Sequence, residues 1–160
     1  METVKIAIEM EDGGVMKGEL YPEIAPITVE NFLNLIDQDF FAGLIFHRVI
    51  PGFMIQGGGY DKDFNHHVAK SIKGEFSSNG VKNDLLHTRG VLSMARTMIP
   101  DSASSQFFIM HEDAPHLDGQ YAAFGKITDG LEIVDKIANM PRNFQDCPNE
   151  PVVIKTIRRD

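Results

Sequence analysis

Apolar and charged residues alternate over the first ten positions of the chain. Every second residue from Val4 to Met10 is apolar, whereas Lys5 and Glu9 lie between them. A period of two places the apolar side chains on one face of a strand. Residues 12–14, Asp-Gly-Gly, are typical of a turn, and the alternation resumes from Met16 to Leu20. The chain is therefore expected to open with a β-hairpin.

Two later segments have the spacing of an amphipathic helix. The first begins near Pro26, which suits a first turn because its missing N–H is not needed there. Its apolar positions recur at intervals of three and four residues, at Val29, Phe32, Leu33 and Ile36. In the second, Asp129 and Glu132 have the spacing of a capping box, with Asp129 as N-cap. The residues expected to face the core from this second helix are Leu131, Val134, Ile137 and Ala138.

The remaining apolar runs are short and bounded by turn-forming residues, which is typical of strands. They cover residues 45–50, 53–56, 91–95, 106–110, 121–127 and 152–157. Pro51 and Gly52 fit the two central positions of a type II turn. Residues 57–90 are mostly polar, and so long an irregular stretch is often functional. About seven or eight strands with two helices favour an antiparallel sheet or a closed barrel over a doubly wound parallel sheet, and the pattern alone does not choose between a barrel and a sandwich.

Length, charge and cysteine content narrow the class of protein. The 160 residues are expected to form one domain, residues 1–160. The formal net charge of −8 argues against nucleic acid or an anionic membrane as a partner. No signal-peptide pattern is present, and no apolar run approaches the roughly 20 residues of a membrane span. The one cysteine, Cys147, permits neither an intrachain disulfide nor a CxxC metal site, and we expect a cytoplasmic protein.

Sequence motifs for several kinds of chemistry are absent. The chain has no phosphate-binding loop, no dinucleotide fingerprint, no nucleophile elbow and no HExxH zinc motif. His66 and His67 lie in a polar stretch without metal-ligand spacing, so we expect neither a metal nor a cofactor. Ser93 or Ser105 could be combined with a histidine and an aspartate into a triad. The chain offers so many such combinations that chance accounts for them.

One arginine interrupts an apolar run. Arg48 lies in the predicted strand 45–50, and Phe53, Met54 and Gln56 follow the turn. If the two arms pair as a hairpin, these four side chains lie close together. The alternative is that Arg48 is a charge on an edge strand that deters aggregation.

A second candidate patch covers residues 104–109. In a strand, Gln106 and Phe108 share one face and Phe107 points to the other. One phenylalanine would then enter the core while the other lines a surface.

These two patches belong to four longer motifs. They are FHRVIPGFMIQGGG from Phe46, GVLSMAR from Gly90, SSQFFI from Ser104 and LDGQYAAFGKI from Leu117. In this order and spacing they resemble the cyclophilin-type peptidyl-prolyl cis-trans isomerases, and the chain is similar to single-domain prokaryotic members. The resemblance extends over nearly the whole sequence. It implies a mainly β fold, a closed eight-stranded antiparallel β-barrel with two α-helices capping its ends.

The resemblance also implies a function and a site. The expected activity is rotation about Xaa–Pro peptide bonds, without metal or cofactor, on proline-containing peptides and on unfolded or folding proteins. The expected catalytic residues are Arg48, Phe53 and Gln56. The expected substrate-binding residues are Met54, Ala95, Arg96, Gln106, Phe108, His116, Leu117 and Tyr121.

Three of these positions depart from the pattern of the eukaryotic members. His116 stands where many have Trp, Tyr121 where many have His, and Arg96 where many have Asn. Because the family's Trp contacts the inhibitor cyclosporin, weak cyclosporin binding is expected here. We also expect a monomer. Two other classes of function stay open: a peptide-binding module that does not catalyse, and a β-barrel carrier with a hollow interior.

Overall fold

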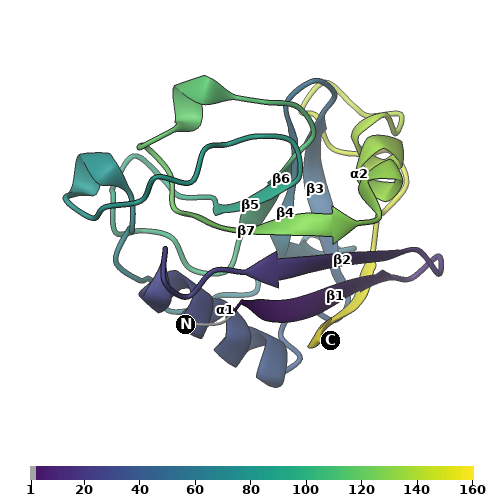
Figure 1. Cartoon of the computed structure of the whole chain (residues 1–160). Helices are drawn as coiled ribbons and strands as arrows, with labels where there is room; N and C mark the ends of the chain where they lie inside the picture. Colours follow the sequence, from purple (N-terminus) through teal and green to yellow (C-terminus); the bar gives the residue numbers. More distant parts are fainter. Residues whose placement is uncertain (1–2) are drawn as a thin grey trace.

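The computed structural model describes residues 3–160, so the first two positions of the expected domain lie outside the described residues. The structure is mainly β, with eight strands and two α-helices (Figure 1). The strands are β1 Val4–Met10, β2 Val15–Leu20, β3 Leu44–Ile50, β4 Met54–Asp61, β5 Val91–Met94, β6 Phe107–Met110, β7 Ala123–Asp129 and β8 Ile154–Arg159. The helices are α1 Pro26–Asp37 and α2 Leu131–Ala138, with short 3₁₀ turns at Ser77–Asn79 and Pro115–Leu117. No helix within residues 3–160 is long and apolar enough to cross a bilayer.

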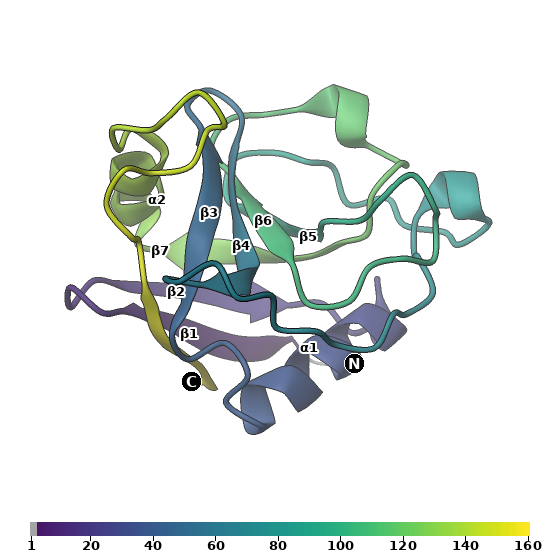
Figure 2. The same cartoon turned by 180° about the vertical axis from the view of Figure 1, so that it is seen from behind.

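The eight strands form one antiparallel sheet that curls almost into a closed barrel. Their order is β3-β4-β6-β5-β7-β2-β1-β8. The two ends of the sheet meet through the residues just before β8: Ile45 of β3 forms a bridge with Val153, and the Phe46 N–H donates to the Val152 carbonyl over 3.0 Å. Figure 2 shows β8, in yellow, descending beside β3. The barrel expectation is confirmed, and closure leaves little unpaired strand edge.

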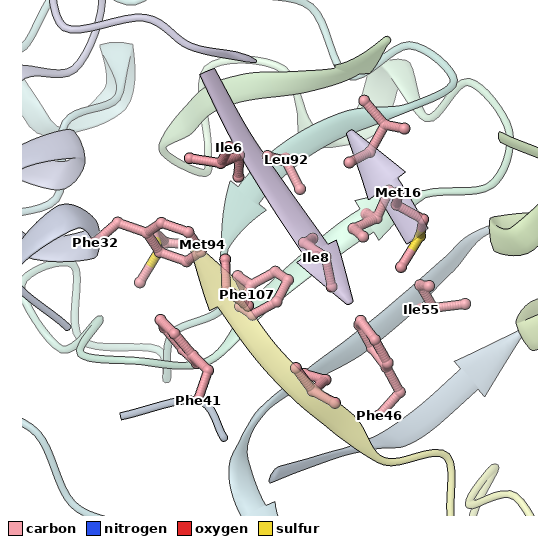
Figure 3. Close-up of a cluster of buried hydrophobic side chains, with 14 of the residues drawn as sticks. Ile6, Ile8, Met16, Phe32, Phe41, Phe46, Ile55, Leu92, Met94 and Phe107 are labelled. Carbon is pink, nitrogen blue, oxygen red and sulfur yellow. The ribbon is translucent and has the colours of Figure 1, made fainter. Parts of the chain in front are cut away.

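The interior of the barrel is filled by side chains. Phe107 lies at its centre, with ring centroids 5.3 Å from Phe32, 5.7 Å from Phe41 and 5.9 Å from Phe46 (Figure 3). Both helices contribute buried residues to this core, α1 packing against β8 and α2 against β2, β3 and β4. A carrier needs an empty interior, so the packed core excludes the small-ligand carrier.

The first helix starts at Pro26 as expected, but its buried face differs from the predicted one. Leu35 is buried, whereas Leu33 is only half-buried. The start of the helix has no local side-chain cap. Instead the buried carboxylate of Glu75 accepts hydrogen bonds from the Thr28 N–H (2.6 Å) and the Thr28 hydroxyl (2.8 Å). A residue 47 positions away therefore satisfies this helix end, which no local pattern shows.

The predicted capping box of the second helix is wrong. Asp129 is the last residue of β7, where it pairs with Lys17. The N-cap position is Gly130, with φ +95°, and no side chain caps the helix. A Cβ at Gly130 would lie 2.8 Å from the Val15 carbonyl oxygen, so the close approach of β2 requires glycine.

The predicted hairpin around Pro51 is confirmed, but its second arm is longer than expected. Gly52 has φ +82°, and the Phe53 N–H donates to the Ile50 carbonyl (3.0 Å). Strand β4 continues through the three glycines to Asp61 rather than ending at residue 56. A Cβ at Gly59 would lie 2.5 Å from the Gln106 side chain, so glycine at this position leaves the room that Gln106 occupies. Strand ends elsewhere differ by two residues or fewer, with β6 starting at Phe107, β7 at Ala123 and β8 at Ile154.

Candidate active site

A cavity of about 170 Å³ opens on the outside of the barrel wall. Its walls come from the β3–β4 hairpin, the end of β5, β6, and the segment that precedes β7. The lining residues are Arg48, Phe53, Met54, Gln56, Ala95, Arg96, Phe108, Leu117 and Tyr121. All nine are among the eleven residues expected from the sequence, so the structure brings these scattered positions to one place.

The floor of the cavity is apolar. Met54, Phe108 and Leu117 are buried in a small cluster separate from the barrel core, and Phe53 and Tyr121 pack against it. The rings of Phe108 and Tyr121 meet edge to face, with centroids 5.8 Å apart. Such a floor can accept a compact aliphatic ring.

The alternation of β6 separates the two phenylalanines. Phe107 is fully buried in the barrel core, and Phe108 belongs to the cavity floor. This confirms the two-sided arrangement expected from the sequence.

A polar edge runs along one side of the floor. Arg48 in β3 pairs in register with Gln56 in β4, and its Nη1 lies 3.4 Å from Gln56 Oε1. The Gln56 amide donates to Gln106 Oε1 (3.1 Å). Gln106 lines a neighbouring cavity of about 240 Å³ that shares Gln56, Ala95 and Arg96 with the first. The two cavities therefore adjoin along the barrel wall, and together they are called the groove.

The guanidinium of Arg48 keeps most of its hydrogen-bonding capacity. The side chain is exposed, and within residues 3–160 it forms no ion pair. The alternative, in which Arg48 is a charge that protects an open strand edge, requires unpaired backbone groups beside it. The backbone is paired there instead, because the next residue, Val49, donates its N–H to the Asp146 carbonyl over 2.7 Å.

Arg96, in contrast, is occupied by structural contacts. Its guanidinium lies between the rings of Phe76 and Tyr121, 4.6 Å from each centroid. It also donates to the carbonyl oxygens of Thr97 (2.9 Å) and Gln120. The side chain therefore fixes Tyr121 at the wall of the cavity, which Arg96 also lines. No local pattern predicts this stacking, because both rings come from distant parts of the chain.

His116 stands at the rim rather than in the cavity. It lies in the 3₁₀ turn Pro115–Leu117, it is exposed, and its ring centroid is 5.6 Å from that of Phe53. A ligand that extends beyond the floor past Phe53 would meet this imidazole.

Behind Phe108 lies a serine–histidine–aspartate row, one of the many such combinations that the sequence permits by chance. His87 Nε2 is 2.8 Å from Ser93 Oγ, and His87 Nδ1 is 3.1 Å from Asp118 Oδ1. Ser93 is fully buried, so no substrate carbonyl can reach its hydroxyl. Burial lowers the pKa of His87, and the neighbouring carboxylate of Asp118 opposes that shift. The row supports the wall from behind, since the His87 ring stacks on Phe108 at 6.1 Å.

Residues 3–160 contain no group of three or more histidine, cysteine, aspartate or glutamate side chains arranged to hold a metal ion. The groove itself presents an arginine, two amide side chains and an apolar floor.

Comparison with known proteins agrees with this geometry. The family model described as cyclophilin type peptidyl-prolyl cis-trans isomerase matches residues 4–159. A peptidyl-prolyl cis-trans isomerase of Acinetobacter baylyi is 45% identical, over 94% of this chain and 84% of that protein. Peptidyl-prolyl cis-trans isomerase B of Escherichia coli is 41% identical, over 86% of this chain and 88% of that protein.

A solved structure shares the fold as well. The crystal structure of a cyclophilin type peptidyl-prolyl cis-trans isomerase from Cryptosporidium parvum superposes with a TM-score of 0.85 at 30% identity, covering 99% of this chain and 98% of that one. The match of the family model over almost the whole chain, the bacterial relatives and the shared barrel lead to one conclusion: this chain belongs to the cyclophilin-type peptidyl-prolyl cis-trans isomerases.

Proposed function

We propose that this chain catalyses cis–trans isomerisation of Xaa–Pro peptide bonds in the groove on its barrel wall. The observation that carries the proposal is the exposed guanidinium of Arg48 at the edge of a cavity of about 170 Å³ that has an apolar floor. A proline ring is apolar, and its amide nitrogen lies at the edge of that ring. The cavity floor and Arg48 match these two features.

The reaction needs no bond to break. Amide resonance sets a barrier of about 18–20 kcal/mol, and twisting the C–N bond localises a lone pair on the prolyl nitrogen. A hydrogen-bond donor aimed at that nitrogen is useful only in the twisted state, so it stabilises the transition state more than the substrate. Arg48 is permanently charged and carries several donors, which suits this role. Lowering the barrier by about 7 kcal/mol would accelerate exchange by roughly five decades.

The remaining residues would bind the substrate. Phe53, Met54, Phe108 and Leu117 would enclose the proline ring. Gln56 and the main chain of residue 96 would hold the carbonyl groups, with Ala95 and Gln106 forming the groove wall. Tyr121, fixed by Arg96, would set the position of the rotating bond. Members of the family bind proline-containing peptides, and a Cryptosporidium parvum relative, 31% identical, has been crystallised in the presence of the dipeptide Ala-Pro.

The second candidate function is a peptide-binding module that uses the same groove without catalysis. Arg48 discriminates between the two, because a binder does not need a donor aimed at the prolyl nitrogen. Exchange spectroscopy by NMR on a short Xaa–Pro peptide tests the proposal directly. We expect exchange to accelerate at substoichiometric protein without added metal. Peptide binding with an unchanged exchange rate would favour the binding module.

The biological setting forms part of the same proposal. Unfolded and folding proteins are the expected substrates, because their Xaa–Pro bonds populate both isomers and exchange slowly. We further propose one domain over residues 1–160 that acts as a monomer in the cytoplasm, and a single cysteine agrees with a reducing compartment. We expect cyclosporin to bind weakly, because His116 stands at the rim where many family members have the Trp that contacts the inhibitor. Gel filtration, cell fractionation and refolding of a proline-limited protein test these points.

A further inference from the structure

His111 follows directly after β6 and lies against the turn that joins β3 to β4. The residue is 9% exposed. Its main-chain N–H donates to the Phe53 carbonyl (2.9 Å), and its Nδ1 accepts a hydrogen bond from the Gly52 N–H (2.8 Å). His111 therefore holds two adjacent residues of the turn, Gly52 and Phe53. Phe53 and the next residue, Met54, line the cavity.

The other ring nitrogen of His111 faces α2. Nε2 lies 3.0 Å from Asp135 Oδ1. Arg89 binds the same carboxylate with two hydrogen bonds, of 2.6 and 2.9 Å, and donates a third to the His111 carbonyl (3.0 Å). An ionised carboxylate only accepts hydrogen bonds, so Nε2 carries the proton and Nδ1 is free to accept from Gly52. The ion pair thus determines which ring nitrogen meets the turn.

We propose that the side chain of His111 is a positioning residue for proline isomerisation, holding the β3–β4 turn through the Gly52 N–H while Asp135 and Arg89 set its tautomer. The inference rests on the proposed function of the groove. The turn connects the strand that carries Arg48 to the strand that carries Met54. Its position therefore sets the distance between the Arg48 guanidinium and the apolar floor of the cavity. Displacements of about 1 Å at such sites are costly, because catalysis depends on aligned groups.

Two substitutions distinguish the role of Nδ1 of His111 from the role of its Nε2. His111→Asn places an amide oxygen near the position of Nδ1, where it can accept from Gly52, but it does not reach Asp135. His111→Gln places its amide near the position of Nε2, where it can donate to Asp135, and it leaves the Gly52 N–H without an acceptor. A role in catalysis through the turn predicts that only the second variant loses activity.

We expect kcat/KM of His111→Asn to stay within about twofold of the unmodified protein, and that of His111→Gln to fall about three- to tenfold, as loss of one hydrogen bond implies. Hydrogen exchange of the Gly52 amide should accelerate in His111→Gln and not in His111→Asn. Thr28→Val is the matched control, since it removes a buried hydroxyl hydrogen bond to Glu75 at the start of α1. This control should lose stability and keep kcat/KM.

Full activity in His111→Gln, or equal losses in His111→Asn and His111→Gln, would overturn the inference. A test independent of variant folding is the ¹⁵N spectrum of the His111 ring in the unmodified protein. Protonation on Nε2 is expected, and protonation on Nδ1 would overturn the inference. Failure of the proposed function has a different signature, which is an unmodified protein that folds and does not accelerate exchange.

Discussion

Replacing Arg48 separates catalysis from folding, because its side chain is exposed and supports little of the fold. Within residues 3–160 its side-chain hydrogen bond is the long 3.4 Å contact from Nη1 to Gln56 Oε1. Surface substitutions away from caps, buried networks and strained backbone change the free energy of unfolding by about 0.5 kcal/mol or less. For a domain of this size that corresponds to a shift in Tm of about 2 °C or less. We therefore expect Arg48→Ala and Arg48→Lys to fold normally.

The effect on catalysis should be much larger than the effect on folding. Removing one donor that acts mainly in a transition state costs about 2.7–4 kcal/mol in the analogous case of an oxyanion hole, or about 10²–10³ in rate. Arg48→Lys keeps the charge but loses the planar fork that can reach nitrogen and carbonyl together. We expect both variants to lose most of kcat/KM.

The assay is protease-coupled or NMR-detected isomerisation of a Xaa–Pro peptide, with Tm measured in parallel. Arg158→Ala is the matched control, because Arg158 is an exposed arginine on β8 that pairs with Glu9. It should leave kcat/KM unchanged. Full activity in both Arg48 variants would refute the mechanism and return Arg48 to the status of a surface charge.

Three further predictions concern the rim, the core and a buried histidine. His116→Trp should bind cyclosporin about 10- to 70-fold more tightly in a direct titration. The indole adds a hydrogen bond worth about 0.5–1.5 kcal/mol and buries more apolar surface, worth about 1 kcal/mol. An unchanged affinity would place His116 outside the inhibitor site. Phe107→Ala should lower the free energy of unfolding by about 3–5 kcal/mol in urea, since the ring packs on three other phenylalanines; a loss below about 1 kcal/mol would contradict a packed barrel. Burial, assisted by Arg48 and a neighbouring histidine, lowers the pKa of His47 from 6.5 to about 4. The unfolded chain therefore takes up this proton first as the pH falls, and stability should drop by up to about 3 kcal/mol between those values. His47→Phe should reduce that drop, leaving the part due to His87, and an equally steep drop in the variant would show that His47 is not its source.

Much of the local structure could be predicted from the order of apolar and polar residues. The period of two located β1 and β2, and it predicted that Phe107 and Phe108 point to opposite sides of their strand, one into the core and one toward a surface. Pro51 and Gly52 identified the hairpin turn because proline restricts φ at the first central position and glycine tolerates the positive φ required at the second, which is +82° at Gly52. The four motifs identified the family and with it all nine residues of the cavity. These features depend on each residue's own preferences or on its immediate neighbours, which the sequence displays directly.

What the tertiary structure decided depends on segments that are far apart in the chain. Glu75, not a local residue, satisfies the start of α1, and the pairing of Asp129 with Lys17 keeps that aspartate from capping α2. Arg96 is held between two rings that precede and follow it by 20 and 25 positions. His111 meets Gly52 across 59 positions. Such contacts form only after the barrel brings the segments together, and their energies depend on distance and burial, which residue spacing does not encode.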